Sequence, residues 1–589
     1  MAIRLKEVDA VTVGVGWTGS ILARELTKAG LTVVGLERGA NQSPAQDFAL
    51  PGIRDEFKYR LRTELMQDTA METLTLRHAP GETALPWRRW GAFSPGDGVG
   101  GAGTHWNGVT WRFLPTDFEI RSHLTQRYGR NAIPPEMTLQ DWGVTYAELE
   151  PYFDRFEKLC GVSGKAGNLG GQKIEGGNIF EGPRAAEYPN KPLTMAQCGL
   201  IFDKATKGLG MHPFPIPSSN NSAAYTNPEG LTLGACQYCG HCEFFGCEAN
   251  SKASPHTCIL PVLLKDPKYE LRTNAYVNKI IYDKAARKVS GVTYIDRRTG
   301  EEYEQPANIV LLCAYPFNNT GLMLMSGIGA PYDPGTGQGV VGKNYCYQVT
   351  SNMQIFVDDE INPFIGTGVS PCAVDDWQGD NFDHGGLGFF GGGFISAAQT
   401  GGRPIQVRAV PPGTPRWGSE WKKATAQWYN HFFAINTHGS NYPHRNNYLD
   451  LDPNYKDAIG RPLVRMTFNL FENDWKMSAF LTEKAVQIGR AINPRHMGNA
   501  VPRRGNFDGR VGQTVHNTGG TIMGADPRTS VVNRYLQSWD ADNLFVMGAS
   551  VFAHNGGYNP TGTVGALAYW SARAIVQDYV KMPGPLVRA

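Results

Sequence analysis

The sequence of 589 residues has no run of about 18 uninterrupted apolar residues, the length that a membrane-spanning helix needs. It also lacks clusters of Lys and Arg, and its net charge is only +2, so we expect no nucleic-acid partner. The N-terminus carries neither an apolar signal-peptide region nor a twin arginine and goes straight into a strand pattern. We therefore expect the chain itself to encode no membrane anchor and no export signal.

The composition is that of an ordinary globular protein. Hydrophobic residues make up 41% and charged residues 19%, which is usual for a soluble chain. A chain of 589 residues is too long for one simple core, so two domains are expected. The 70 glycines predict many tight turns and places where the backbone approaches a ligand closely. Ten cysteines, six of them scattered, do not form a short disulfide framework and leave the compartment open.

A glycine-rich turn stands near the N-terminus, between a strand pattern and a helix pattern. The apolar run 8–13 predicts a buried parallel strand, and the apolar spacing within 20–29 predicts a helix. Between them, Gly14, Gly16 and Gly19 form the motif G-x-G-x-x-G. The first glycine permits the turn, the second lets the backbone approach a pyrophosphate, and the third lets helix and strand pack closely. The positive end of the helix dipole then faces the phosphates.

An acidic residue ends the strand that follows this helix. Residues 31–36 form a second apolar run, and Glu37 stands 18 residues beyond Gly19. From this place a carboxylate accepts hydrogen bonds from a ribose hydroxyl, and it disfavours a 2′-phosphate. Because strand, turn, helix, strand and acid follow in the required order, the segment predicts a site for FAD or NAD rather than NADP. A glycine-rich turn without a ligand is the alternative that this order argues against.

Five further stretches carry a resemblance that extends from one end of the chain to the other. They read GVGGAGTHWNG (98–108), ANIVLLCAYPFNNTGLMLMSGIG (307–329), VHNTGGTIMG (515–524), NLFVMGASVF (543–552) and NPTGTVGALAYWSARAIV (559–576). Together they resemble the glucose–methanol–choline (GMC) oxidoreductases, a family of flavoproteins. The second stretch departs from the family's signature before its closing SGIG. The resemblance implies that the dinucleotide is FAD.

The same resemblance implies how the chain divides. We expect an α/β protein (α+β overall), with a Rossmann-like FAD-binding domain built from discontinuous segments and a sheet-based substrate domain. Residues 1–345 would form the FAD-binding domain with inserted segments, 346–504 the substrate-binding domain, and 505–589 the return to the FAD-binding domain. Turn signals and alternating residues at 447–470 suit strands joined by hairpins.

Oxidising an alcohol at a flavin needs a base for the hydroxyl proton while hydride leaves carbon. Histidine suits this role because its unperturbed pKa near 6.5 leaves it partly neutral at working pH. His516 matches the family's catalytic histidine, and Asn559 matches a second position that holds His or Asn in the family. Asn559 would hold the substrate oxygen without titrating, which leaves His516 as the base. His554 is the alternative if this correspondence is displaced, and a structural role is the default for any other histidine.

The resemblance also implies which residues contact the flavin. The stretch Thr104-His105-Trp106 looks like the T-H-W of pyranose oxidases, whose histidine carries the flavin through a covalent bond. FAD is therefore expected either to be linked through His105 or to be bound without a link. Asn107 falls at the asparagine of a family loop close to the flavin. The expected cofactor-binding residues are Gly14, Gly16, Gly19, Glu37, Gly101, Thr104, His105, Trp106, Asn107, Val277, Gly548 and Thr561.

Four of the ten cysteines, Cys236, Cys239, Cys242 and Cys247, are packed into the segment CQYCGHCEFFGC (236–247). Two disulfides within so short a segment would strain the geometry, so none is expected. Soft thiolates at this spacing select zinc or an iron–sulfur cluster. The continuous run favours iron–sulfur, because zinc commonly uses two separated pairs; zinc and buried structural cysteines are the alternatives. Some members of the family bind a 3Fe-4S cluster through three cysteines, and the different spacing here does not tell which thiol would be left out.

The resemblance implies an FAD-dependent dehydrogenase of a sugar acid, a sugar or a polyol. Its overall character is similar to flavoprotein subunits of gluconate dehydrogenases, so oxidation of D-gluconate to 2-ketogluconate is the expected reaction. In such complexes a small chaperone-like subunit, which often carries the export signal, and a multihaem cytochrome c accompany the flavoprotein. A flavin collects two electrons as hydride, whereas a cytochrome accepts one at a time. A cluster between them would pass the electrons on singly. A periplasmic protein held at the membrane by its partners is implied, with the cytoplasm as the alternative.

Other functions stay open at this point. The T-H-W stretch favours an oxygen-using enzyme similar to pyranose oxidase, and a glucoside 3-dehydrogenase would share the subunits but not the substrate. A flavin-binding subunit without catalysis is disfavoured because His516 and Asn559 are both present. No substrate residue is assigned. A gluconate carboxylate would favour a cation, and no motif marks any arginine of the expected substrate domain, among them Arg403, Arg408, Arg416 and Arg445.

Overall fold

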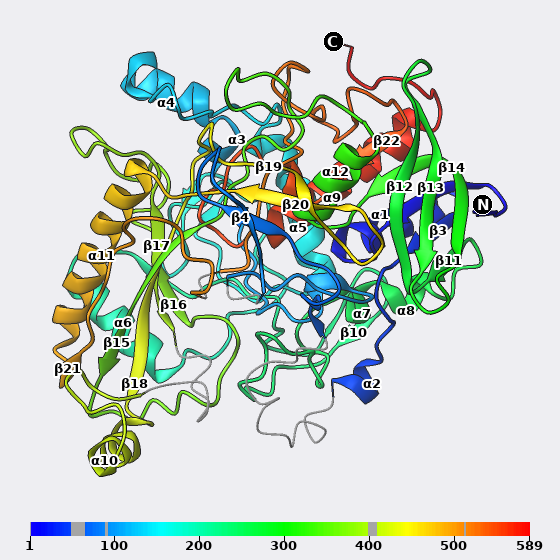
Figure 1. Cartoon of the computed structure of the whole chain (residues 1–589). Coiled ribbons are helices and arrows are strands. Elements are labelled where there is room, and N and C mark those ends of the chain that lie inside the picture. Colours follow the sequence, from blue (N-terminus) through cyan, green and yellow to red (C-terminus); the bar gives the residue numbers. More distant parts are fainter. Residues whose placement is uncertain (1, 49–64, 89–91, 399–408, 512–513, 589) are drawn as a thin grey trace.

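Two main β-sheets lie toward opposite sides of the molecule, with a smaller sheet between them (Figure 1). Each main sheet collects strands from distant parts of the sequence, so neither corresponds to one continuous segment. The computed structural model describes residues 2–48, 65–88, 92–398, 409–511 and 514–588.

The first sheet carries the predicted dinucleotide fold. It comprises β1 (Ile3–Arg4), β2 (Val8–Val13), β3 (Val33–Leu36), β11 (Tyr269–Arg272), β12 (Ala275–Asp283), β13 (Lys288–Asp296), β14 (Glu302–Leu312) and β22 (Leu544–Val546). The order is β11–β3–β2–β14–β13–β12, with β1 and β22 also paired to β14. β11, β3, β2, β14 and β22 run parallel, whereas β12, β13 and β14 form an antiparallel meander. The apolar runs seen in the sequence are thus strands at the centre of a parallel sheet, where both faces are covered.

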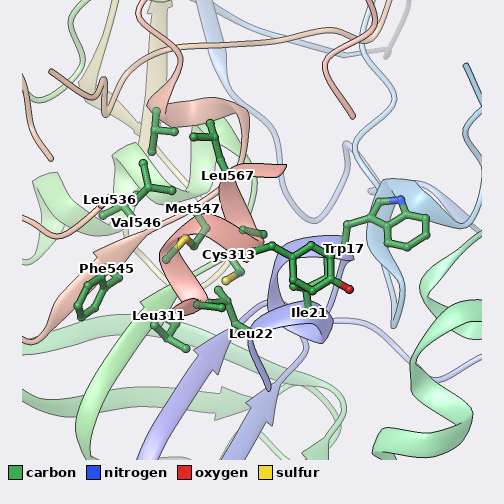
Figure 2. Packing of buried hydrophobic residues seen from close by; sticks show 14 of the residues in the cluster. Trp17, Ile21, Leu22, Leu311, Cys313, Leu536, Phe545, Val546, Met547 and Leu567 are labelled. Atoms are coloured by element: carbon green, nitrogen blue, oxygen red, sulfur yellow. The ribbon is translucent and has the colours of Figure 1, made fainter. Parts of the chain in front are cut away.

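One helix packs on this sheet, and a second helix, from the other end of the chain, packs on the first. They are α1 (Trp17–Lys28), which follows the glycine-rich turn, and α12 (Thr561–Ala574). The two helices contact each other, and α12 also packs against α5 (Tyr146–Cys160). The C-terminal strand β22 therefore lies in the same sheet as the N-terminal strand β2, and the C-terminal helix α12 lies beside α1. Figure 2 shows the apolar cluster that joins these segments, which includes Ile21, Leu22, Leu311, Cys313, Met547 and Leu567.

The second sheet is antiparallel throughout. It comprises β8 (Pro213–Phe214), β15 (Val349–Phe356), β16 (Cys372–Val374), β17 (Gly393–Ala398), β18 (Phe432–Gly439) and β21 (His496–Met497), in the order β21–β15–β18–β17–β16–β8. The helices α11 (Glu472–Ile492) and α6 (Gln197–Gly208) pack on it, and α11 runs along the outer edge of the molecule in Figure 1. Most of this sheet falls within 346–504, and β8 and α6 come from earlier in the chain.

The third sheet contains the hairpin predicted at 447–470. Its strands are β19 (Tyr448–Lys456), β20 (Pro462–Thr467), β4 (Thr75–Arg77) and β5 (Leu85–Pro86). The hairpin β19–β20 pairs with β4 and not with the second sheet, so it links the N-terminal part of the chain to the later part. Further elements are α2 (Pro44–Asp47), α3 (Pro115–Phe118), α4 (Ile120–Tyr128), β6 (Asn168–Leu169), β7 (Gln172–Lys173), β9 (Tyr225–Thr226), β10 (Thr232–Leu233), α7 (Pro255–Cys258), α8 (Leu260–Leu263), α9 (Pro316–Met325) and α10 (Ser419–Trp428).

None of the helices in the described ranges is long and apolar enough to cross a membrane. This matches the absence of long apolar runs in the sequence.

Candidate active site

A cavity of about 670 Å³ is lined by residues of both main sheets. Its volume is typical of small-molecule and cofactor sites. Gly19 and Thr104 are buried but do not line it. The predicted residues that do line it are Gly14, Gly16, Glu37, Gly101, His105, Trp106, Asn107, Val277, Gly548, Thr561, His516 and Asn559.

The turn between β2 and α1 shows what each of its glycines does. Gly14 has a φ of +94°, and a Cβ there would lie 2.6 Å from the carbonyl oxygen of Cys313. A Cβ on Gly19 would lie 2.0 Å from the carbonyl oxygen of Gly14. A Cβ on Gly16, in contrast, would meet nothing closer than 3.8 Å. Gly14 and Gly19 are needed by the fold itself, whereas Gly16 leaves open space at the helix N-terminus, where a pyrophosphate binds.

Glu37 lies at the end of β3, in the same part of the cavity. The backbone N–H groups of Val15 and Gly39 donate to its two carboxylate oxygens at 3.0 and 3.1 Å. Burial raises the pKa of Glu37, and these hydrogen bonds oppose that rise. The carboxylate is thereby fixed at the edge of the cavity, where it can accept from a ribose hydroxyl.

Charged side chains surround this part of the cavity. Arg38 pairs with Glu72 and, at 3.0 Å, with Asp97. Arg461 pairs with Asp457 at 2.9 Å. We call the part of the cavity lined by Gly16, Glu37, Arg38 and Arg461 the nucleotide end. Its open turn, helix N-terminus and fixed carboxylate fit a dinucleotide such as FAD.

The loop 98–108 contributes three neighbouring residues to the cavity wall, His105, Trp106 and Asn107. Nε2 of His105 is buried and has no hydrogen-bond partner in the described structure. Burial, with a smaller contribution from the charge of Lys252, lowers the pKa of His105 to about 4. The ring is therefore neutral and presents an unpaired nitrogen beside the cavity.

His516 and Asn559 meet in another part of the cavity. Nδ2 of Asn559 lies 3.2 Å from Nε2 of His516, and Nδ1 of His516 lies 2.7 Å from Oε1 of Gln348. The amide of Gln348 is oriented by its own Nε2, which donates to Oδ1 of Asn555 at 3.1 Å and to the carbonyl of Tyr558 at 2.9 Å. The imidazole proton is therefore on Nδ1, and the electron pair of Nε2 accepts from Nδ2 of Asn559. We call the part of the cavity lined by His516, Asn559 and the second sheet the catalytic end.

The electrostatics of His516 suit a base. Burial, with a smaller contribution from His438, lowers the pKa of His516 to about 3. The ring is thus neutral at working pH, and its Nε2 can accept a proton from a hydroxyl in the cavity. Gln348, which fixes this tautomer, was not foreseen from the sequence because no motif marks it and only the fold brings it to His516.

His554, the alternative base, has a different environment. Its Nε2 lies 3.3 Å from Oδ1 of Asp117, and Nε1 of Trp142 donates to its Nδ1 at 3.2 Å. The residue is fully buried and does not line the cavity. Because its ring does not reach the cavity in which a substrate would bind, we assign His554 a structural role.

The second sheet supplies a wall of the catalytic end that the sequence analysis did not foresee. Phe394 of β17 and Asn436 and His438 of β18 line the cavity. Oδ1 of Asn436 accepts from Asn352 at 2.7 Å, and the ring of His438 stacks on Phe394 with centroids 4.7 Å apart. The sequence of β18 marks a strand, but nothing in it distinguishes the residues that face a ligand.

All ten cysteines are free thiols, which confirms that the segment 236–247 forms no disulfide. Cys242 is buried, and Cys236, Cys239 and Cys247 are partly exposed. Burial raises the pKa of Cys236 and Cys239, and that of Cys242 to about 12. In the described parts of the chain, no three or more His, Cys, Asp or Glu side chains are arranged to hold a metal ion. The four thiols as placed therefore do not form a closed metal site.

A buried lysine ties this segment to the cavity wall. Nζ of Lys252 donates to the carbonyl oxygen of Trp106 at 2.6 Å and to that of Cys242 at 2.7 Å. The backbone N–H of Phe244 also donates to the carbonyl of His105 at 2.7 Å. The cysteine segment and the loop 98–108 are thus one hydrogen-bonded unit.

The arginines considered for a substrate carboxylate do not reach the cavity where they are described. Arg445 donates to the carbonyl oxygen of Pro334 at 2.6 Å, and neither it nor Arg416 lines the cavity. Arg403 and Arg408 lie outside the described residues.

Family models of GMC oxidoreductases match residues 223–350 and 443–568. The gluconate 2-dehydrogenase flavoprotein of Pantoea cypripedii is 48% identical over 595 residues, covering 100% of this chain and 97% of the relative. The fructose dehydrogenase large subunit of Gluconobacter japonicus is 25% identical and covers 97% of this chain and 98% of the relative. Among solved structures, pyridoxine 4-oxidase from Mesorbium loti has a TM-score of 0.57 at 14% identity, covering 96% of this chain and 98% of that one, which shows a shared fold.

Proposed function

The chain belongs to the GMC oxidoreductase family, and from this premise we propose that it oxidises a secondary alcohol of a sugar acid, a sugar or a polyol. It is an FAD-dependent oxidoreductase similar to gluconate 2-dehydrogenase flavoproteins, so D-gluconate, giving 2-ketogluconate, is the first substrate to test. The observation that carries the proposal is the neutral His516, whose Nε2 lies in the cavity with Nδ2 of Asn559 as its only described hydrogen-bond partner.

FAD supplies the acceptor for the hydride that leaves the substrate carbon. Gly16, Glu37 and the loop 98–108 would hold it, because they provide the open turn, the fixed carboxylate and the cavity wall. Val277, Gly548 and Thr561 line the same cavity and complete the proposed cofactor contacts.

The protein's own contribution is to move one proton and to hold one oxygen. Nε2 of His516 takes the proton of the substrate hydroxyl, and Nδ2 of Asn559 donates to the oxygen from which it leaves. Oε1 of Gln348 accepts from Nδ1–H before and after this transfer, so it keeps the ring oriented and stabilises its protonated form.

A covalent link between FAD and His105 is a finer proposal. It is supported by the unpaired Nε2 and by the lowered pKa of His105, since a neutral ring nitrogen is needed for bonding. Flavin that stays with the protein in acid and that is released in the His105→Ala variant would support the link. Flavin that is released from the native sequence by acid would mean binding without a link.

An iron–sulfur cluster on the cysteine segment, 3Fe-4S by resemblance, is also a proposal. In its support, Tyr238 and Phe244 have φ values of +53° and +67°, a costly conformation for such residues that sites shaped for a ligand often contain. Against it, the thiols as placed do not form a metal site, so we derive no electron path through a cluster. Iron and acid-labile sulfide measured on anaerobically purified protein decide between a cluster, zinc and no metal.

Partners and location are proposals of the same kind. The printed name of the relative from Gluconobacter japonicus describes a large subunit, which supports a multi-subunit enzyme. We propose a small chaperone-like subunit, a multihaem cytochrome c and a periplasmic site at the membrane, with the cytoplasm as the alternative. Cell fractionation followed by purification under mild conditions tests these points together.

The activity is tested with a substrate panel and two rival acceptors. D-gluconate, other sugar acids, sugars and polyols are each supplied with an artificial dye or with oxygen. Turnover of gluconate with the dye and little with oxygen supports the dehydrogenase. Turnover of free sugars with oxygen would favour a pyranose-oxidase-like enzyme, and turnover of glucosides with the dye would favour a glucoside 3-dehydrogenase. No flavin reduction by any substrate would contradict the proposal.

A further inference from the structure

The second sheet presents to the cavity one histidine that no motif assigns. His438 lies in β18, which is hydrogen-bonded to β15 on one side and to β17 on the other. Because a strand that is paired on both sides has a fixed backbone, the positions from which its side chains project are fixed as well. His438 and Asn436 are two residues apart, so they project from the same face of the sheet, and both line the cavity.

Packing, and not hydrogen bonding, fixes the ring of His438. The ring stacks on Phe394 with centroids 4.7 Å apart and an interplanar angle of 21°. Phe394 in turn lies 5.1 Å from the ring of Trp111. Nδ1 of His438 is buried without a partner among the described residues, and the residue lines the cavity. A polar side chain held rigidly with unused hydrogen-bonding capacity is what a bound ligand satisfies.

His438 shares this space with the base. Both histidines line the cavity, and the ring centroid of Phe394, on which His438 stacks, lies 6.1 Å from that of Tyr558, the residue before Asn559. A substrate whose reacting hydroxyl lies at His516 and Asn559 therefore brings its neighbouring atoms toward the wall formed by the second sheet.

The polar groups on this wall are uncharged. Asn436 and His438 are the polar side chains that the wall contributes, and the charged residues of the described lining, Glu37, Arg38, Glu72, Glu243, Asp457 and Arg461, all lie outside the second sheet. Uncharged donors and acceptors suit hydroxyl groups. We propose, on the basis of the function proposed above, that the imidazole of His438 binds the hydroxyl next to the one being oxidised, so that the site selects vicinal diols over isolated secondary alcohols.

The test compares two substrates that differ in one hydroxyl. D-gluconate and its 3-deoxy analogue are supplied to the full-length holoenzyme, and kcat and KM are measured for each. His438→Phe keeps the stacking ring and removes both nitrogens, and His438→Gln restores a hydrogen-bonding group. Ser396→Ala is the matched control, because Ser396 lies opposite Asn436 on β17, its buried hydroxyl has no partner in the described structure, and it does not line the cavity. FAD content and the thermal unfolding midpoint show that each variant is folded.

The native sequence should prefer gluconate to the 3-deoxy analogue. His438→Phe should lower kcat/KM for gluconate by roughly 10–100-fold and leave that for the analogue nearly unchanged, so the preference collapses. His438→Gln should recover part of the preference, and Ser396→Ala should keep all of it. Equal losses for both substrates in His438→Phe, or no loss, would overturn the inference while leaving the proposed function intact. A native enzyme that oxidises neither substrate, nor any other polyol, would overturn the proposed function, and the inference with it.

Discussion

At the nucleotide end of the cavity, charged side chains pair with one another, Arg38 with Glu72 and Arg461 with Asp457. At the catalytic end, imidazoles and amides predominate, and burial keeps His516 neutral. The nucleotide end is suited to a permanent, charged cofactor, and the catalytic end is suited to moving a proton without competition from fixed charges.

The two ends also differ in how the sequence encodes them. The nucleotide end is built largely from one continuous segment, in which glycine spacing and a terminal acid carry the information. The catalytic end is assembled from β17, β18 and the C-terminal stretches, which lie far apart in the sequence. Substitutions at one end should therefore impair its function, FAD binding or proton transfer, without impairing that of the other end.

The largest effect is expected at the catalytic end, from His516→Ala. Flavin reduction by substrate should slow by about 10²–10⁴-fold while FAD stays bound, because only the proton acceptor is lost. Stopped-flow absorbance under anaerobic conditions measures the rate. A His516→Ala variant that reduces its flavin at the native rate would show that the base has been assigned wrongly. So would a His554→Ala variant that keeps the native stability and loses more of the rate of flavin reduction than His516→Ala does.

A matched pair of glycine variants separates cofactor binding from folding at the nucleotide end. Gly16→Ala should leave the fold intact and weaken FAD binding roughly 5–150-fold, since its Cβ occupies space that only a ligand uses. Gly19→Ala should destabilise the protein itself, because its Cβ would lie 2.0 Å from the Gly14 carbonyl oxygen. Circular dichroism reports the fold and flavin fluorescence the FAD content. Full FAD binding by a folded Gly16→Ala variant would refute the assignment of the pyrophosphate site.

Two substitutions of Gln348 test how the neutral base is held. Gln348→Leu should lower kcat by about 10–100-fold, because Nδ1–H of His516 loses its acceptor. Gln348→Glu should raise the pKa of His516, since a nearby carboxylate favours the charged ring. Because a base works only when unprotonated, the acid limb of the pH–rate profile should move upward from about pH 3, where burial places it. An unchanged profile in Gln348→Glu would mean that this contact does not control the ring.

The smallest effect concerns a buried acid behind the catalytic end. Asp375 accepts hydrogen bonds from Tyr558 and, at 2.6 Å, from Asn178, and burial raises its pKa to about 7. In the unfolded chain an Asp ionises near 3.9, so between about pH 4 and 7 only the folded state keeps the proton. Stability should therefore fall as pH rises through this window, by up to about 1.4 kcal/mol per pH unit. Thermal unfolding at several pH values should show a shallower slope in Asp375→Asn, and an identical slope would argue against a raised pKa.

The sequence predicted the strand–turn–helix unit and the hairpin at 447–470, because each is written in local spacing. It also directed attention to His516 and Asn559, through resemblance, and the structure brings them within 3.2 Å of each other. It could not predict Gln348 or His438, whose roles arise only when β15 and β18 are placed beside the C-terminal stretches. For the cysteine segment, spacing suggested a metal site, but spacing alone does not fix where the thiols point.

One measurement tests the central claim most directly, namely anaerobic mixing of the holoenzyme with D-gluconate while the flavin absorbance is followed. We predict rapid bleaching of the flavin, slowed when C2 of the substrate carries deuterium, because the bond to that hydrogen breaks in the step. Flavin that stays oxidised with gluconate and with every other sugar acid, sugar and polyol would contradict the claim.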